Sequence, residues 1–286
     1  MKILVVGGTR FFGIPMIEKL LAEGHDVTIA TRGQARNPFA DQTSQIMMDR
    51  TDEKQVKEAL VECSYDLIID KVAYSSNDVK ALLENASCRR YIQMSSGSVY
   101  DREKENIKEE EFDPASYPLV WQSRNDNYAE GKRLAERAAL EFMDASDCVF
   151  VRYPVVLGEN DYTGRLKFYV DHIREGIPMY VDSLDYGIAF IHEKQAGEFI
   201  AFLADHEFSG PINGSSRGWI TARQIIQYTE EKTGKKAILS DDGEKAPFNG
   251  LPDNESYDTE KAARLGYHFS DLNDWIYELL DHYINL

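Results

Sequence analysis

Residues 1–13, MKILVVGGTRFFG, decide the fold of this chain. The run from Lys2 to Val6 is apolar at nearly every position, which is typical of a central strand in a parallel sheet covered on both faces. Gly7 and Gly8 end this run. The apolar residues that follow recur at helical spacing as far as Gly24, a typical C-terminal stop; they are Phe11, Phe12, Ile14, Ile17, Leu20 and Leu21. The stretch therefore predicts a strand, a glycine turn and a helix.

The spacing of the glycines indicates a binding site for a dinucleotide. In such sites the first glycine makes a tight turn, the second lets the backbone approach a pyrophosphate, and the third lets the helix pack on the strand. Gly7 and Gly13 fill the first and third places, and Arg10 stands at the second. Because a helix N-terminus offers free amides and a positive dipole end, the anion site does not depend on that one glycine. We expect Gly7, Arg10, Phe11, Phe12 and Gly13 to contact the cofactor.

Length, composition and charge exclude several classes of protein. A chain of 286 residues can fill one large domain or two unequal ones. Its apolar content of 43% and the lack of a long apolar run or a secretory signal predict a cytoplasmic protein without a membrane span. Three scattered cysteines predict neither a disulfide framework nor a metal site. A net charge of −17 argues against nucleic acid or an anionic membrane as the main partner.

The end of the second predicted strand, Asp26–Thr31, bears on the choice of cofactor. Dinucleotide folds meet the adenosine ribose just past this strand, where an Asp or Glu would bind the 2′-hydroxyl of NAD. Arg32 and Gly33 stand there instead. Arg32 can pair with a 2′-phosphate or stack on adenine, and Arg10 can reach the same region. We therefore expect NADP, with NAD as the alternative; taken alone, Arg32 is equally an exposed loop residue.

Strands and helices continue to alternate through the first half of the chain. The predicted strands are Gln45–Met48, Asp66–Asp70, Arg90–Ser95 and Cys148–Val151, and the predicted helices cover residues 52–60, 77–84 and 127–139. This alternation predicts an α/β fold with a doubly wound parallel sheet. Ligands of such sheets bind at the carboxyl ends of the strands. We therefore expect cofactor contacts at two strand ends, from Asp49, Arg50, Val72 and Ala73.

A tyrosine and a lysine one helical turn apart, Tyr128 and Lys132, form the candidate catalytic pair. The spacing YxxxK occurs four times in the chain, so the spacing alone carries little weight. Tyr128 and Lys132 are the pair that lies on a predicted helix between the fifth strand and the next buried strand. A serine-rich strand end, residues 95–98, precedes them. Their position in the predicted fold therefore singles them out.

Several motifs together resemble the NAD(P)-dependent epimerase/dehydratase family of extended short-chain dehydrogenases/reductases. They are GGTRFFG at 7–13, SSGSVY at 95–100, YAEGK at 128–132, RYPVVLG at 152–158 and DTEKAARLGY at 258–267. The loop with its arginine is similar to an atypical branch that includes chloroplast stem-loop-binding proteins. Asp101 departs from the family pattern, which has glycine after VY.

The resemblance implies a Rossmann domain over residues 1–153 and a mainly substrate-binding lobe over 154–286, with a segment at about 187–205 returning to the Rossmann sheet. It implies that Tyr128 is the acid/base and that Ser96 binds the substrate oxygen. Lys132 and the positive nicotinamide of an oxidised cofactor are the groups expected to lower the Tyr128 pKa, and Lys132 is also expected to hold the nicotinamide ribose. Ser98 is the neighbouring alternative to Ser96. The residues expected beside the nicotinamide are Tyr153, Pro154 and Val155. Arg165 and Arg217 are either ligands of a substrate diphosphate or simply charged surface residues.

Three functions follow from these expectations. The first is an epimerase, dehydratase or reductase of nucleotide sugars, with dehydratase disfavoured because no Asp-Glu pair follows Ser96. The second is an NADP-dependent carbonyl reductase acting on another small metabolite. The third is a non-catalytic NADP-binding or RNA-binding relative, and the acidity of the chain argues against its RNA-binding form. The resemblance also implies a homodimer.

Overall fold

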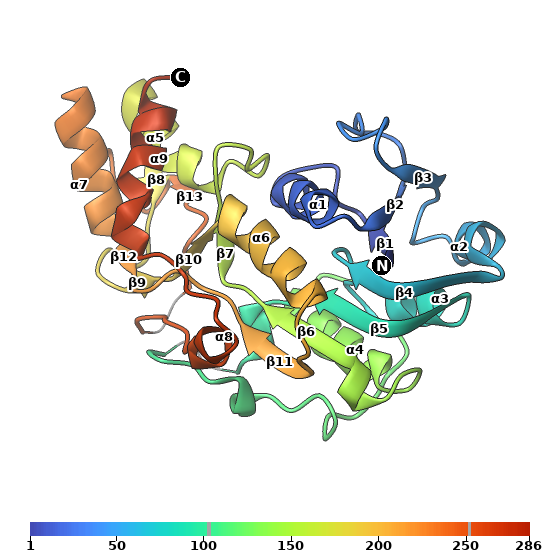
Figure 1. Cartoon of the computed structure of the whole chain (residues 1–286). Coiled ribbons are helices and arrows are strands. Elements are labelled where there is room, and N and C mark those ends of the chain that lie inside the picture. Colours follow the sequence, from blue (N-terminus) through green and yellow to red (C-terminus); the bar gives the residue numbers. More distant parts are fainter. Residues whose placement is uncertain (102–103, 251–252) are drawn as a thin grey trace.

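Seven parallel strands form the main sheet of the computed structural model, which describes residues 1–101, 104–250 and 253–286. Their order across the sheet is β11-β6-β5-β4-β1-β2-β3 (Figure 1). The strands are β1 (Lys2–Val6), β2 (Asp26–Thr31), β3 (Ser44–Met47), β4 (Cys63–Asp70), β5 (Ala86–Met94), β6 (Cys148–Arg152) and β11 (Gly210–Asn213). The order reverses between β1 and β4, which makes the carboxyl ends of these two strands the topological switch point. The predicted doubly wound α/β fold is confirmed.

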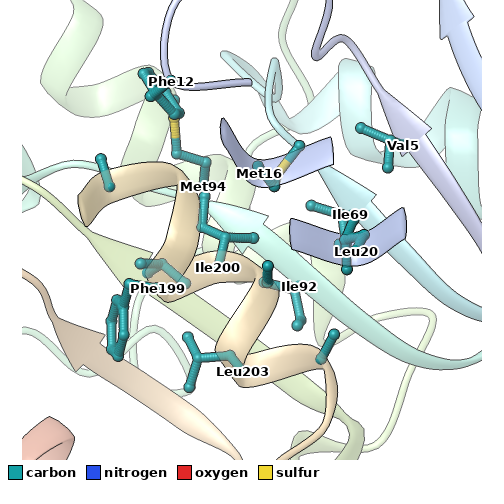
Figure 2. Packing of buried hydrophobic residues seen from close by; sticks show 14 of the residues in the cluster. Val5, Phe12, Met16, Leu20, Ile69, Ile92, Met94, Phe199, Ile200 and Leu203 are labelled. Carbon is teal, nitrogen blue, oxygen red and sulfur yellow. The ribbon is translucent and has the colours of Figure 1, made fainter. Parts of the chain in front are cut away.

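Helices cover both faces of this sheet. On one face lie α1 (Gly13–Ala22) and α6 (Glu193–Ala204), and on the other lie α2 (Glu53–Leu60), α3 (Ser76–Leu83) and α4 (Tyr128–Ala139). Successive strand residues point to opposite faces, so β1 sends Val5 to one core and Leu4 to the other. Figure 2 shows the first core, where side chains of the sheet meet those of the two covering helices; the labelled residues are Val5, Phe12, Met16, Leu20, Ile69, Ile92, Met94, Phe199, Ile200 and Leu203.

The second half of the chain returns to the sheet differently from the sequence-based expectation. The segment at about 187–205, which was expected to return to the Rossmann sheet, begins with two short strands outside the main sheet. They are β9 (Gly187–Ile188), which pairs with β12 (Ile220–Thr221), and β10 (Phe190–His192), which pairs with β7 (Val155–Leu157). Helix α6 then packs against α1. The strand that joins the sheet is β11, whose Gly210 and Pro211 hide it from a pattern search. Proline is tolerated because β11 is an edge strand.

A separate hydrophobic cluster forms the C-terminal lobe. It joins α5 (Arg165–Glu175), α7 (Ala222–Thr233) and α9 (Ile276–Ile284) through residues such as Tyr169, Ile225 and Leu280. The small elements of this half are β8 (Met179–Tyr180), β13 (Glu244–Lys245) and α8 (Glu260–Arg264). Within the described residues, every helix is too short or too polar to span a bilayer.

A fully buried ion pair ties the sheet to the segment that follows β5. The Arg152 guanidinium donates to the Glu136 carboxylate of α4 at 3.0 and 2.7 Å, and both side chains have no exposed surface. The same guanidinium donates to the carbonyls of Glu109 and Phe112 and to the Tyr100 hydroxyl. One cation therefore holds Tyr100, Glu109 and Phe112 against the end of β6.

Replacing Glu136 by Ala is expected to lower the free energy of unfolding by about 3–5 kcal/mol, because the buried Arg152 charge loses its counter-ion. Denaturant titration measures this change. The matched control is Glu141→Ala, which breaks the partly exposed pair with Arg137 and is expected to cost less than about 1 kcal/mol. Equal losses in the two variants would contradict an anchoring role for the buried pair.

Candidate active site

Two cavities meet at the carboxyl ends of the strands. The larger, of about 590 Å³, lies between the sheet and the lobe, and the smaller, of about 250 Å³, lies over β1 and β2. Lys71 and Tyr162 line both cavities. The predicted residues in the larger cavity are Phe11, Phe12, Ser96, Ser98, Tyr128, Tyr153, Pro154, Val155 and Arg165. Those in the smaller cavity are Gly7, Arg10, Arg32, Asp49, Arg50 and Val72.

The glycine loop has the geometry that an anion site requires. Gly7 and Gly8 adopt φ angles of +92° and +110°, which side chains other than glycine rarely accept. A Cβ atom on Gly13 would lie 2.4 Å from the Gly8 carbonyl oxygen, so the third glycine lets α1 begin directly against the loop. The first turn of α1 has no capping side chain and no acidic residue. The amides of Gly13, Ile14 and Met16 donate to the carbonyls of residues 10–12, so it is the dipole of α1 that fits a phosphate group.

Tyr128 is the first residue of α4 and lines the larger cavity with 45% of its surface exposed. Asn127 caps the helix by accepting a hydrogen bond from the Glu130 amide. Ser96 lies near Tyr128 and acts to lower the Tyr128 pKa, and the Ser98 hydroxyl donates to the Ser96 hydroxyl oxygen at 3.0 Å. Three hydroxyl groups therefore line one cavity, and Ser96 is the serine that acts on Tyr128.

Lys132 lies one turn further along α4 and is fully buried. Its ammonium donates to the carbonyls of Ala73 at 2.8 Å and Met94 at 2.9 Å, at the ends of β4 and β5. Its Nζ lies 4.3 Å from the ring centre of Tyr74 and 5.8 Å from that of Tyr128. An ammonium has three N–H donors, and these two bonds use two of them. Lys132 itself lines neither cavity, because the Tyr74 ring and the helix cover it. Ala73 contributes to the site through its carbonyl rather than its side chain.

The pKa values of Tyr128 and Lys132 differ from those expected for an acid/base pair, in which the tyrosine pKa is lowered. Burial lowers the pKa of Lys132 to about 7, although the nearby Asp70 carboxylate opposes the shift. Burial raises the pKa of Tyr128, against the effects of Ser96 and the charge of Arg165. Lys132 is not among the groups that shift the Tyr128 pKa, since its ammonium is directed at two carbonyls.

The smaller cavity contains both arginines that favour NADP. Arg10 and Arg32 are exposed at its rim, and the charge of Arg32 reaches Asp49, which also lines the cavity. Arg50 has a different role from the one expected. Its guanidinium is buried in an ion pair with Asp70 and donates to the Asp78 carbonyl. Arg50 therefore serves mainly to brace the end of β4.

Four predicted residues stand apart from the cavity walls: Ala73 and Lys132, described above, and Gly13 and Arg217. Gly13 lies behind the loop, where it packs on Gly8. Arg217 is exposed on the connection before β12, and its backbone bonds to Ser270 and Leu272. It lines neither cavity. Arg165, by contrast, starts α5 at the cavity wall and donates to the Thr163 hydroxyl at 2.9 Å.

Several residues that line the cavities were not predicted from the sequence: Lys71, Tyr74, Arg124, Tyr162, Phe248 and Tyr257. Lys71 directly follows the predicted strand Asp66–Asp70, so its place at a strand end was a usable signal. Arg124 and Tyr162 come from irregular segments, which have no hydrophobic period to place them. Arg124 lies over the Tyr74 ring and donates to the Val72 carbonyl at 2.9 Å.

The lowered pKa of Lys132 predicts a pH-dependent contribution to stability. Between the folded pKa of about 7 and the ordinary value of 10.5, the unfolded chain binds the extra proton, so stability from this group rises with pH. We expect wild type to gain free energy of unfolding relative to Lys132→Met between pH 7 and pH 10, as measured by urea titration. The control Lys194→Met removes a lysine that is 70% exposed and should show no such trend. If the difference in free energy of unfolding between wild type and Lys132→Met stayed constant with pH, the pKa of Lys132 would not be lowered by burial.

Comparison with solved structures extends over essentially the whole chain. MoeE5 in complex with UDP-glucose and NAD superposes with a TM-score of 0.75 and 17% identity, covering 100% of this chain and 98% of that one. The UDP-glucose 4-epimerase of Thermus thermophilus, in complex with NAD, gives a TM-score of 0.72 and 17% identity, with 99% of each chain covered. At these identities the likeness shows the fold, lobe included.

Two sequence comparisons complete the assignment. The chain is 27% identical over 239 residues to the chloroplast stem-loop binding protein of 41 kDa b from Arabidopsis thaliana. The match covers 77% of this chain and 60% of the length of that protein. The model of the NAD dependent epimerase/dehydratase family matches residues 3–83 and 71–214. This chain therefore belongs to the NAD-dependent epimerase/dehydratase family.

Proposed function

We propose that this chain is an NADP-dependent enzyme that transfers a hydride and a proton at a carbinol or carbonyl carbon of a nucleotide sugar. The observation that carries the proposal is that Ser96 and Tyr128 line one cavity, with the buried ammonium of Lys132 5.8 Å from the ring centre of Tyr128. In this family fold the cavity opens at the carboxyl ends of the strands. An acid/base group, a hydrogen-bond donor for a substrate oxygen and a cation are therefore present together.

Each of these groups has a distinct task. The bound dinucleotide supplies the hydride acceptor or donor. Ser96 orients the substrate oxygen, and Tyr128 takes the proton from that oxygen or returns it. The Lys132 ammonium, with two N–H donors used by carbonyls, would give the third to a ribose hydroxyl of the dinucleotide. Since burial raises the Tyr128 pKa, Tyr128 needs added positive charge to act as a base, and an oxidised nicotinamide would bring one.

The preference for NADP over NAD is supported by Arg10 and Arg32. Both line the smaller cavity, and guanidinium groups pair well with phosphate. The structural relatives named above were solved with NAD, which remains the alternative. Asp49 also lines this cavity, and it accepts hydrogen bonds from the Thr51 amide and hydroxyl. Asp49 is thus held in place, where it is a candidate acceptor for the adenine amino group.

A nucleotide sugar is supported by the size and position of the larger cavity. It extends past Tyr128 to lobe residues such as Ile188, Phe248 and Asn249, with Arg165 at its wall. Arg165 can neutralise a substrate diphosphate. MoeE5, which shares the fold, was solved with UDP-glucose. The alternative is a carbonyl reductase, which would turn over small carbonyl compounds but none of a panel of nucleotide sugars.

Replacing Tyr128 by Phe is expected to lower kcat by roughly 10²–10⁴-fold on the nucleotide sugar that is turned over, because the proton has no carrier. Affinity for NADP should stay close to that of wild type. The control Tyr186→Phe removes a hydroxyl outside both cavities and should leave kcat unchanged. Full activity in Tyr128→Phe would overturn the assignment of Tyr128.

Stem-loop RNA binding is a second candidate function, favoured by the match to the chloroplast stem-loop binding protein. The net charge of −17 opposes it, because RNA affinity depends on cations that neutralise phosphates. We expect no binding of a stem-loop RNA in a filter-binding assay at about 0.15 M salt. Submicromolar binding, retained in Tyr128→Phe, would instead support a non-catalytic relative.

A further inference from the structure

We propose that Lys71 binds the diphosphate of the dinucleotide, and so adds a cation beside Gly7 to the one that Arg10 brings to the glycine loop. This inference rests on the proposed function, since it names a residue for the same cofactor. Lysine at this position was not among the residues expected from the sequence. Three observations carry it: the place of Lys71 in the sheet, the surroundings of its ammonium, and the junction between the two cavities.

Lys71 directly follows β4 at the topological switch point. Its amide donates to the Val6 carbonyl at 3.1 Å, which extends the pairing of β1 and β4 by one residue. A Cβ atom on Gly7 would lie 3.6 Å from the Cβ of Lys71. Lys71 and the first glycine of the loop are therefore neighbours, at the point where doubly wound sheets bind ligands.

The ammonium of Lys71 lies against the aromatic ring of Phe12 and, in the part of the chain that the structure describes, not against an anionic group. Its Nζ lies 3.8 Å from the ring centre of Phe12, just before α1. Among the residues that the structure describes, none forms a hydrogen bond or ion pair with this ammonium. Burial lowers its pKa to about 8. A half-buried cation with no counter-ion is costly, and an anionic ligand would remove that cost.

The junction of the cavities identifies the anion. Lys71 and Tyr162 are the described residues that line both cavities. A dinucleotide with its adenosine beside Arg32 and its nicotinamide beside Tyr128 has to cross this junction, and its diphosphate is the part that joins the two halves. Lys71 and the N-terminus of α1 would hold that group from two sides. In a chain of net charge −17, such a local cation is needed to attract phosphate at all.

The experiment is isothermal titration calorimetry of NADP, ADP and adenosine 2′-monophosphate into wild type and three variants. In Lys71→Met we expect NADP and ADP to bind roughly tenfold or more weakly, as for loss of a charged hydrogen bond. Adenosine 2′-monophosphate has no diphosphate, so its affinity should not change. Lys71→Arg should retain most of the affinity, and the control Lys194→Met all of it. Circular dichroism melts verify that each variant is folded.

Wild-type affinity of Lys71→Met for NADP and ADP would overturn the role of Lys71 while leaving the proposed function standing. An equal loss for adenosine 2′-monophosphate would also overturn it, since Lys71 would then act on the adenosine side or through the fold. A wild-type chain that binds neither NADP, NAD nor ADP would refute the proposed function together with this inference.

Discussion

The close approach of α4 to the ends of β4 and β5 is the constraint on which the site depends. A Cβ atom on Gly131 would lie 2.4 Å from the Tyr74 carbonyl oxygen, so only glycine lets the helix come this near. The next residue, Lys132, then reaches two strand-end carbonyls and is buried with its charge. The first turn of α4 consequently holds Tyr128 near Ser96 and Tyr74. The arrangement of these side chains is thus a consequence of how one helix packs on the sheet.

Electrostatics divide the molecule into an acidic exterior and a local basic site. The cations at the two cavities are Arg10, Arg32, Arg50, Lys71, Arg124 and Arg165. Two of them form ion pairs within the protein, Arg50 with Asp70 and Arg124 with Asp78. Such pairing fixes the strand ends rather than binding a ligand. The cations without a described anionic partner, above all Lys71, are those that remain for phosphate.

The sequence predicts the sheet well and the site in part. Runs such as Lys2–Val6 and Asp66–Asp70 have a pattern that buried parallel strands alone satisfy, and the glycine loop and the start of α4 are local features. Strand β11 escapes prediction because Pro211 is acceptable only at an edge that the sequence does not reveal. The role of Arg50 escapes because its partner, Asp70, comes from another strand. Tyr162 and Arg124 reach the cavities from irregular segments, whose paths are set by tertiary packing.

The central claim is that a dinucleotide lies across the β1/β4 switch point with its reactive end at Tyr128. A crystal structure of the chain with NADP tests it most directly. The account predicts the diphosphate over the Gly7–Gly13 loop, the 2′-phosphate near Arg32, and a nicotinamide ribose hydroxyl within hydrogen-bond distance of the Lys132 ammonium. A dinucleotide bound elsewhere, or one whose nicotinamide points away from Tyr128, would contradict it.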